Sequence, residues 1–287
     1  MRYHDYTRQR KKMRKLEKQI IHEKQDLTYL SWAKIRNSSG TAGSFLKSYS
    51  ESGNEKTYYK LSDYDRVDGI VGHECVNEII VDRLLDILGI EHLHYQLIHS
   101  QIVIDDKEHE TYLCASKDFK EAGESKIALD VYYEIEKEKD ETPLEFCVRK
   151  GWEEYIYQML VVDFLILNRD RHGANIEVLR NSKKKEVRLA PLFDHGLSLL
   201  CRCHTEDEVN RADVMDDKPV QCFVGSRSTK NNLGLIPKDK RPCLNTLKDE
   251  DKEYLFKGLD GIISEDMKNR IWEMIWKRWK YYESFCN

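Results

Sequence analysis

The sequence of 287 residues has no apolar run that approaches the roughly 18 residues of a membrane-spanning helix. Its basic amino terminus lacks the apolar core segment of a secretory leader. We therefore expect no membrane span, no membrane partner and a cytoplasmic protein. The eight cysteines are scattered, several of them in apolar runs, without the dense framework of a secreted domain. Reduced thiols are therefore expected.

One short cysteine cluster needs separate consideration, because residues 201–204 read Cys-Arg-Cys-His and resemble half of a zinc site. Cys222 and Cys243 are the candidates to complete it. The sequence has no second closely spaced pair, so we favour unliganded thiols over a metal site.

Charge is distributed unevenly along the chain. Residues 1–25 carry nine Lys or Arg and three acidic residues, a net charge of +6, which leaves −10 for the rest of a chain whose formal net charge is −4. A basic stretch of this kind could contact nucleic acid, a phosphorylated partner or the acidic body of its own enzyme. We favour a solvated helix packed on a small lobe and expect no direct nucleic-acid partner.

Two polar blocks carry the strongest chemical signal. Residues 168–175 read Asn-Arg-Asp-Arg-His-Gly-Ala-Asn, and residues 190–196 read Ala-Pro-Leu-Phe-Asp-His-Gly. In kinases, an Asp that orients the acceptor hydroxyl lies beside the metal-bound triphosphate, and an Asn five positions later binds a metal ion from the same loop. Asp170 and Asn175 have this spacing. Asp194 follows a later apolar strand and can offer a carboxylate oxygen to Mg²⁺ from the other side.

The surroundings of the two blocks support this interpretation. Residues 152–167 have the nearly continuous apolar pattern of a buried helix, which would support the first block rigidly. Residues 176–179 and 187–192 read as two strands of a hairpin that leads from Asn175 to Asp194. Either block alone is compatible with an ordinary salt-bridged loop. Both blocks in this order favour phosphoryl transfer.

Together the blocks resemble the HipA-like kinases, whose pattern is Asn-x-Asp-Arg-His-x-x-Asn followed by Ala-Pro-Leu-aromatic-Asp. The resemblance implies an α+β, bilobal protein-kinase-like fold, with a small strand-rich N-lobe and a larger helical C-lobe. It implies Asp170 as the catalytic Asp, Asn175 and Asp194 as metal ligands, and His172 as a nucleotide contact. It also implies ATP and Mg²⁺ as cofactors.

The amino-terminal half offers a candidate phosphate loop in residues 36–47. Glycines in such a loop let backbone N–H groups approach phosphate closely. The Gly-x-x-Gly pattern is weak by itself and lacks the Lys and hydroxyl ending of a P-loop NTPase. The stretch resembles the phosphate loop of the HipA-like family, and its candidate nucleotide contacts are Gly40, Thr41, Ala42, Gly43 and Ser44.

Lys60 follows this loop on a short aromatic-rich strand and is the candidate lysine for the nucleotide phosphates. Residues 69–88 show a wide apolar helical face that ends at Gly89. Glu74 and Glu78 lie one turn apart on that helix, so either could pair with Lys60, and the alternative for both is a solvated helix face. We favour Glu78 as the partner because Asn-Glu-Ile-Ile at 77–80 better matches the family's helix.

Residues 95–104 and 110–115 look like paired strands around an acidic turn. Residues 113–116 would then form the hinge at the adenine edge, with Leu113 and Ala115 as nucleotide contacts. The chain accordingly divides into a basic, helical extension at 1–35, an N-lobe at 36–118 and a C-lobe at 119–287.

We conclude that the chain is an Mg-ATP-dependent phosphotransferase, and the family resemblance favours protein Ser or Thr as acceptor. A kinase-like nucleotide-binding regulatory module and a small-molecule kinase stay open as alternatives, because residues 201–250 read as irregular loops where the acceptor would bind.

The resemblance also implies an antitoxin or other regulatory protein as a candidate partner, and autophosphorylation within the phosphate loop. That loop holds Ser38, Ser39, Thr41 and Ser44, of which we favour Ser39; the alternative is that these hydroxyls only cap turns or donate to phosphate. Phosphate in that loop would repel the phosphates of ATP. Only about 35 residues precede the loop, fewer than in full-length HipA proteins, so we expect a compact variant and do not assume toxin behaviour.

Overall fold

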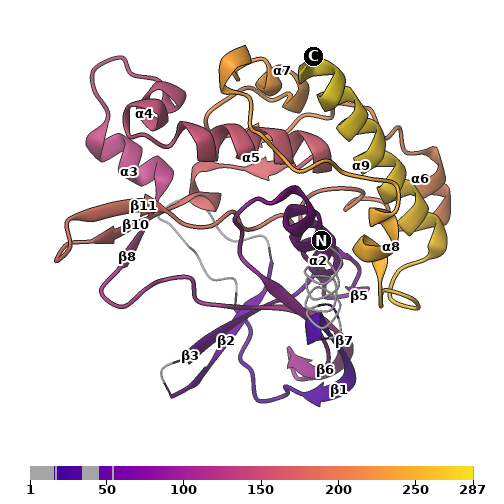
Figure 1. The fold of residues 1–287 in the computed structure, drawn as a ribbon. Coiled ribbons are helices and arrows are strands. Elements are labelled where there is room, and N and C mark those ends of the chain that lie inside the picture. Colours follow the sequence, from indigo (N-terminus) through magenta and orange to yellow (C-terminus); the bar gives the residue numbers. More distant parts are fainter. Residues whose placement is uncertain (1–15, 17, 34–44, 54, 287) are drawn as a thin grey trace, which may run out of the picture.

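The computed structural model describes residues 16, 18–33, 45–53 and 55–286, which form a bilobal molecule (Figure 1). A strand-rich lobe occupies the lower half of Figure 1 and a larger helical lobe the upper half, with helix α2 between them. The expected α+β architecture of two lobes is therefore confirmed. Among these described residues, no helix is both long enough and apolar enough to cross a bilayer.

The N-lobe is built on a five-stranded sheet with strand order β1-β6-β7-β3-β2. Strand β1 runs parallel to β6, whereas the other neighbours are antiparallel. The strands of this lobe are β1 (Ile20–Asp26), β2 (Lys47–Ser52), β3 (Glu55–Lys60), β4 (Tyr64–Asp65), β5 (Gly69–Ile70), β6 (Tyr95–Ile104) and β7 (Lys107–Lys117).

Strand β1 corrects the helical extension expected for residues 1–35. Residues 16, 18 and 19 are helical, but Ile20–Asp26 form a strand that pairs with β6 from Ile20 opposite Leu97 onward. The pairing satisfies the backbone groups of β6 on its outer side and buries Ile20 in the core. The N-lobe therefore begins well before residue 36. Residues 1–15 and 17 lie outside the described part of the chain.

Strand β7 corrects the position of the hinge. It runs without interruption from Lys107 to Lys117, so residues 113–116 lie within the sheet, where Cys114 pairs with Lys60 of β3 and with Leu97 of β6. In the turn between β6 and β7, Asp105 and Asp106 have φ of 50° and 60°. Positive φ at both central residues is what the common two-residue hairpin turn requires. The chain therefore leaves the N-lobe after Lys117.

Helix α2 (Glu74–Leu88) is buried on nearly every side, because it packs against the sheet and the C-lobe together. Its buried residues include polar and charged ones as well as apolar ones: Glu74, Asn77, Glu78, Asp82 and Arg83. Gly89 ends the helix in the left-handed conformation with φ of 77°, as the sequence predicts. The helix begins later than predicted, at Glu74, because Gly69 and Ile70 pair with β4 instead. This placement leaves one face of α2 directed at the space between the lobes.

The C-lobe surrounds helix α5, whose residues from Ile156 to Ile166 are almost all buried. Helix α9 packs against α5 and buries Trp272 and Trp279, so these tryptophans belong to the core. The elements of this lobe are β8 (Ser125–Ala128), α3 (Leu129–Glu136), α4 (Pro143–Arg149), α5 (Glu153–Ile166), β9 (Asp170–Arg171), η1 (Gly173–Asn175), β10 (Glu177–Asn181), β11 (Glu186–Leu189), α6 (Glu206–Arg211), β12 (Gln221–Cys222), α7 (Thr229–Leu233), η2 (Lys238–Lys240), α8 (Asp251–Phe256) and α9 (Glu265–Cys286).

Two local features of the C-lobe follow from short sequence patterns. Thr142 begins α4 with a capping box, in which its hydroxyl accepts from the N–H of Glu145 and the Glu145 carboxylate accepts from the N–H of Thr142. Strands β10 and β11 form the antiparallel hairpin expected between the two polar blocks.

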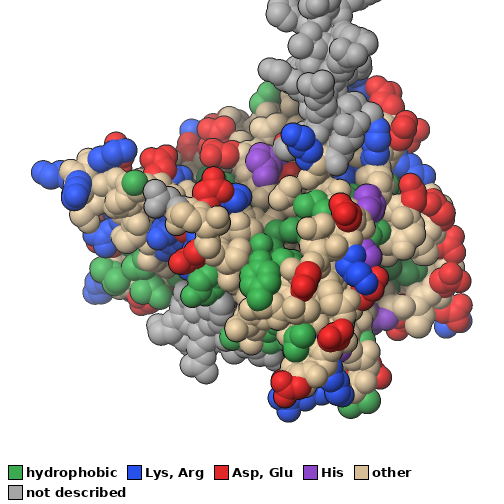
Figure 2. Space-filling model, turned by 90° about the horizontal axis from the view of Figure 1, so that it is seen from below, with side chains coloured by type: hydrophobic (Ala, Val, Ile, Leu, Met, Phe, Trp, Pro, Cys, Tyr) green, Lys and Arg blue, Asp and Glu red, His purple; other side chains and the backbone are tan. Residues whose placement is uncertain are grey.

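The outer surface on the N-lobe side carries basic and acidic side chains interspersed, with hydrophobic groups between them (Figure 2).

Candidate active site

A pocket of about 760 Å³, part of it open to solvent, lies where β3, β6 and β7 meet the segment that contains Asp194. The residues that line it are Lys47, Tyr58, Tyr59, Lys60, Leu93, Tyr95, Cys114, Ser116, Lys117, Phe119, Lys126, Glu177, Phe193 and Asp194.

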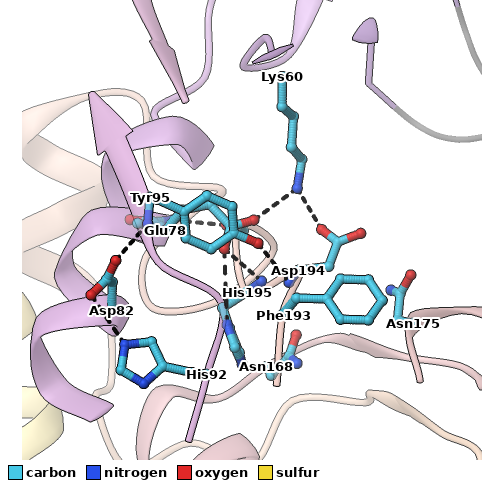
Figure 3. Close-up of polar contacts among 12 residues, drawn as sticks. Lys60, Glu78, Asp82, His92, Tyr95, Asn168, Asn175, Phe193, Asp194 and His195 are labelled. Atoms are coloured by element: carbon cyan, nitrogen blue, oxygen red, sulfur yellow. Dashed lines mark hydrogen bonds and ion pairs between the residues drawn. The ribbon is translucent and has the colours of Figure 1, made fainter. Parts of the chain in front are cut away.

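Lys60 is the central cation of this pocket. Its Nζ lies 2.9 Å from Glu78 Oε1 and also contacts the carboxylate of Asp194 (Figure 3). Burial would lower the pKa of the Lys60 ammonium, but the charges of Asp194 and Glu78 outweigh burial and raise it well above its ordinary value. The side chain is therefore a fixed positive charge between two carboxylates.

Glu78, and not Glu74, is the residue of α2 that contacts Lys60. Glu78 is fully buried, and its second oxygen accepts a hydrogen bond of 2.9 Å from the backbone N–H of His195. Glu74 instead accepts from the backbone N–H of Asp63 at 3.1 Å. Burial without a partner would be costly for a carboxylate, so Glu78 depends on Lys60 and on this backbone bond.

The loop that follows α5 carries Asp170 and Asn175 close together. The side-chain N–H of Asn175 donates to the backbone oxygen of Asp170 at 2.7 Å, so the loop folds back over the five-residue spacing seen in the sequence. Asn168 supports the loop from below, because its Oδ1 accepts from the N–H of Asp170 at 3.2 Å. Figure 3 shows Asn175 beside Phe193 and near Asp194.

A buried ion pair, which sequence reasoning did not single out, anchors this loop. The Arg171 guanidinium donates to both oxygens of Asp163, with Nε–Oδ2 and Nη2–Oδ1 distances of 3.0 Å. Its Nη1 also donates to the backbone oxygens of Asn175 at 3.2 Å and Phe193 at 2.9 Å. Arg171 therefore ties α5, the Asp170 loop and the Asp194 segment together. The sequence feature that could have indicated this ion pair is Asp163, a charged residue within the largely apolar run of residues 156–166, because a buried carboxylate requires a partner.

The Asp194 segment is held in place from the N-lobe. Asp194 has φ of 59°, and its backbone N–H donates to the hydroxyl of Tyr95 at 3.2 Å. The side-chain N–H of Asn77 on α2 donates to the backbone oxygens of Gly196 and Ser198 at 3.0 and 3.1 Å. Burial would raise the pKa of Asp194, but Lys60 beside it keeps that pKa well below its ordinary value. Asp194 therefore stays ionised.

Three of the expected nucleotide contacts lie elsewhere. The side chains of Leu113 and Ala115 pack on the opposite face of the sheet, because neighbouring residues of a strand alternate, and Cys114 and Ser116 line the pocket instead. His172 does not line the pocket; its Nδ1 accepts from the N–H of Ala174 at 3.1 Å and caps the η1 turn. Gly40, Thr41, Ala42, Gly43 and Ser44 lie outside the described residues, as do Ser38 and Ser39.

The pocket also contains cations and rings that sequence reasoning missed. Lys47 and Lys126 line it, and the Lys126 ammonium lies 4.2 Å from the centre of the Phe119 ring. The rings of Phe119 and Phe193 are 5.6 Å apart between centroids. These residues are separated by long stretches of sequence, so no local pattern indicates that they meet. Two more cations and a pair of rings suit a flat, negatively charged ligand.

Comparisons with known proteins agree with this fold. No protein-family model matches the chain. A stretch of 137 residues is 28% identical to the serine/threonine-protein kinase CtkA of Helicobacter pylori strain J99, covering 44% of this chain and 40% of that protein. The match thus spans less than half the length of this relative.

Two solved structures resemble the chain. The crystal structure of the H. pylori proinflammatory kinase CtkA matches with a TM-score of 0.54 and 18% identity, over 89% of this chain and 94% of that one. HipA of Shewanella oneidensis MR-1, solved with HipB and its operator DNA, has a TM-score of 0.41 and 14% identity over 84% of this chain and 57% of that one. The likeness to CtkA confirms the kinase-like fold expected from the two polar blocks.

Proposed function

We propose that the chain is an ATP-dependent serine/threonine protein kinase of the HipA-like type that uses Mg²⁺. The observation that carries the proposal is the contact of the Lys60 ammonium with both Glu78 and Asp194, beside the loop of Asp170 and Asn175. This is the set of side chains that phosphoryl transfer on a kinase scaffold requires. The sequence similarity to a named serine/threonine kinase supports it.

The donors of the site fit the proposed cofactors. Asp194 offers an ionised carboxylate and Asn175 an amide oxygen, and oxygen ligands of this kind suit Mg²⁺. Lys60, Lys47 and Lys126 supply positive charge along the pocket, which suits the phosphates of a nucleotide. When bound, Mg-ATP supplies the phosphoryl group, and the cation neutralises charge on its oxygens.

Each side chain then has a separate task. Lys60, kept in place by Glu78, binds phosphate oxygens, while Asp194 and Asn175 hold the cation. Asp170 is 24% exposed at its side chain and can accept a hydrogen bond from the hydroxyl of an incoming Ser or Thr. The protein thus contributes orientation and charge rather than a covalent intermediate.

The decisive experiment compares Asp194→Ala with Asp207→Ala in labelled-ATP assays on a cell extract, with Mg²⁺ present. Loss of the metal ligand should lower transfer about 10²-fold or more, since a metal-bound transition state gains several kcal/mol from the cation. Asp207 is the matched control because its side chain is 83% exposed and lies on α6. Undiminished labelling by Asp194→Ala would overturn the assignment.

Nucleotide binding is measured on the same preparations. Binding of ATP without labelling of any protein or small molecule would contradict a kinase and favour a nucleotide-binding regulatory module. Labelling of a small metabolite alone would contradict a protein kinase.

A further inference from the structure

A second polar cluster lies one helical turn along α2 from Glu78. Asp82 and Asp86 of α2 and His92 and His94 of the following segment bring one ligand atom each to within 4.8 Å of one another. In the part of the chain that the structure describes, this is the one group of three or more such side chains that converges in this way. Cys201, Cys203 and His204 do not form such a group.

The contacts of His92 direct one ring nitrogen at Asp82. His92 is buried, with its Nδ1 2.7 Å from the backbone oxygen of Ile90 and its Nε2 3.1 Å from Asp82 Oδ1. The carbonyl of Ile90 can only accept a hydrogen bond, so Nδ1 carries the N–H. In that tautomer the lone pair of Nε2 points at Asp82, as the lone pair of a metal-binding nitrogen would.

The spacing of the ligand atoms fits a metal ion. Asp82 Oδ1 lies 3.1 Å from His92 Nε2 and 3.3 Å from His94 Nδ1. Tetrahedral Zn²⁺ with ligands about 2.0–2.1 Å away separates neighbouring ligand atoms by roughly 3.3 Å. Two imidazoles with carboxylates are donors that suit Zn²⁺, whereas Mg²⁺ and Ca²⁺ prefer oxygen alone.

Hydrogen bonds outside the cluster orient its ligands. The contact with Ile90 fixes the His92 tautomer that leaves Nε2 free to bind a metal. Asp82 Oδ2 accepts from the backbone N–H of Tyr95 at 2.7 Å, which directs Oδ1 at the histidines.

We propose that Asp82, His92 and His94 form a zinc site, with Asp86 as the fourth ligand. His94 is the accessible ligand, since its side chain is 57% exposed while that of Asp82 is fully buried. Metal can therefore enter from the His94 side without unfolding of α2.

The zinc site contacts the active site through two elements. Glu78 and Asp82 lie four residues apart on α2, on the same face. Tyr95 donates its backbone N–H to Asp82, and its hydroxyl accepts from the N–H of Asp194 (Figure 3). Zinc would thus hold α2 and Tyr95 in the arrangement that places Glu78 and Asp194 on Lys60. This regulatory part rests on the proposed function, whereas metal binding does not.

Metal binding is tested on chelator-treated full-length protein, titrated with Zn²⁺ in excess Mg²⁺ and without ATP. We expect one zinc ion per chain and a higher Tm with zinc. Loss of an outer-shell partner typically weakens metal binding roughly 10- to 100-fold. His94 is a direct ligand in this proposal, so His94→Ala should weaken zinc binding by at least that much. His22→Ala is the matched control, because His22 is an exposed histidine on β1. Asp194→Ala should bind zinc as the wild type does.

The outcomes separate the two proposals. Failure of the protein to bind zinc, or equal affinity in His94→Ala, would overturn the site, and the cluster would then be a set of hydrogen bonds between Asp82 and the two histidines. Zinc binding in a chain without kinase activity would overturn the proposed function alone. In an active enzyme, removal of zinc should slow transfer roughly 2- to 30-fold, which is the usual extent of coupling between sites. An unchanged rate would refute the regulatory coupling.

Discussion

Arg171→Met is the change that most directly tests how the active site is held together. The Arg171 side chain is 1% exposed and that of Asp163 is 6% exposed, so the pair is isolated from water. Methionine has a similar length but no charge and no donors. The substitution therefore leaves the Asp163 carboxylate buried with Asn168 as its remaining side-chain donor, at 2.8 Å. It also removes the donor shared by the backbone oxygens of Asn175 and Phe193.

The expected loss of stability follows from this burial. Removal of one partner of a buried ion pair costs about 3–5 kcal/mol, because the remaining charge is uncompensated. For a chain of this size each kcal/mol corresponds to roughly 2 °C, so Tm should fall by about 6–10 °C. The exposed pair of Lys24 and Glu110 provides the control. Both side chains are 51% exposed, and Lys24→Met should cost less than about 1 kcal/mol.

A double-mutant cycle identifies the cause. Asn at position 163 keeps the acceptor for Asn168 but removes the charge, so Asp163→Asn should recover about 0.5–3 kcal/mol in the Arg171→Met background. Stability is measured by calorimetry and by urea unfolding with circular dichroism. A loss below about 1 kcal/mol in Arg171→Met, or no recovery in the double variant, would refute the reasoning.

Two further predictions concern activity and pH. Lys60→Ala and Glu78→Gln should each abolish most phosphoryl transfer, and their effects on kcat/KM should be non-additive, because Glu78 acts by orienting Lys60. The control, Glu74→Gln, should stay active, since the Glu74 carboxylate bonds the backbone of Asp63 and not Lys60. Loss of activity in Glu74→Gln alone would show that Glu74 is the functional partner. Burial lowers the pKa of His73 to about 4, and its Nε2 is buried without a hydrogen-bond partner among the residues that the structure describes. The unfolded chain binds that proton near pH 6.5, so stability should fall as pH drops from about 6.5 towards 4, by at most ~1.4 kcal/mol per pH unit for this group. His73→Gln should flatten that slope in pH-dependent unfolding, and an unchanged slope would exclude His73.

The two polar blocks allowed the fold and much of the candidate site to be predicted because their chemistry is local. Asp170 and Asn175 belong to one short loop, so their spacing in sequence already implies proximity in space. Lys60 was instead predicted from its position after the glycine-rich loop, and Glu78 from the resemblance of residues 77–80 to the family's helix. The functional roles of these residues stay predictions.

The local sequence pattern did not predict the structure of a segment where that structure depends on pairing with another strand. Residues 20–26 read as part of a basic helix, but pairing with β6 makes them a strand. Leu113 and Ala115 were placed at the nucleotide edge, yet the register of β7 turns both side chains to the opposite face. In each case the hydrogen bonds of a sheet, made across long sequence separations, decided the position.

The sequence by itself determined the chemistry that the chain can offer: the polar loop after a buried helix, the candidate metal ligands on either side of a hairpin, and the predicted pair of Lys60 and Glu78. Only the tertiary structure decided which further charges meet. Burial removes water as an alternative partner, so the charge of Arg171 must be compensated by Asp163. Asp163 lies on α5 and Arg171 on β9, eight positions apart in the sequence, and the fold of the C-lobe brings the two side chains together.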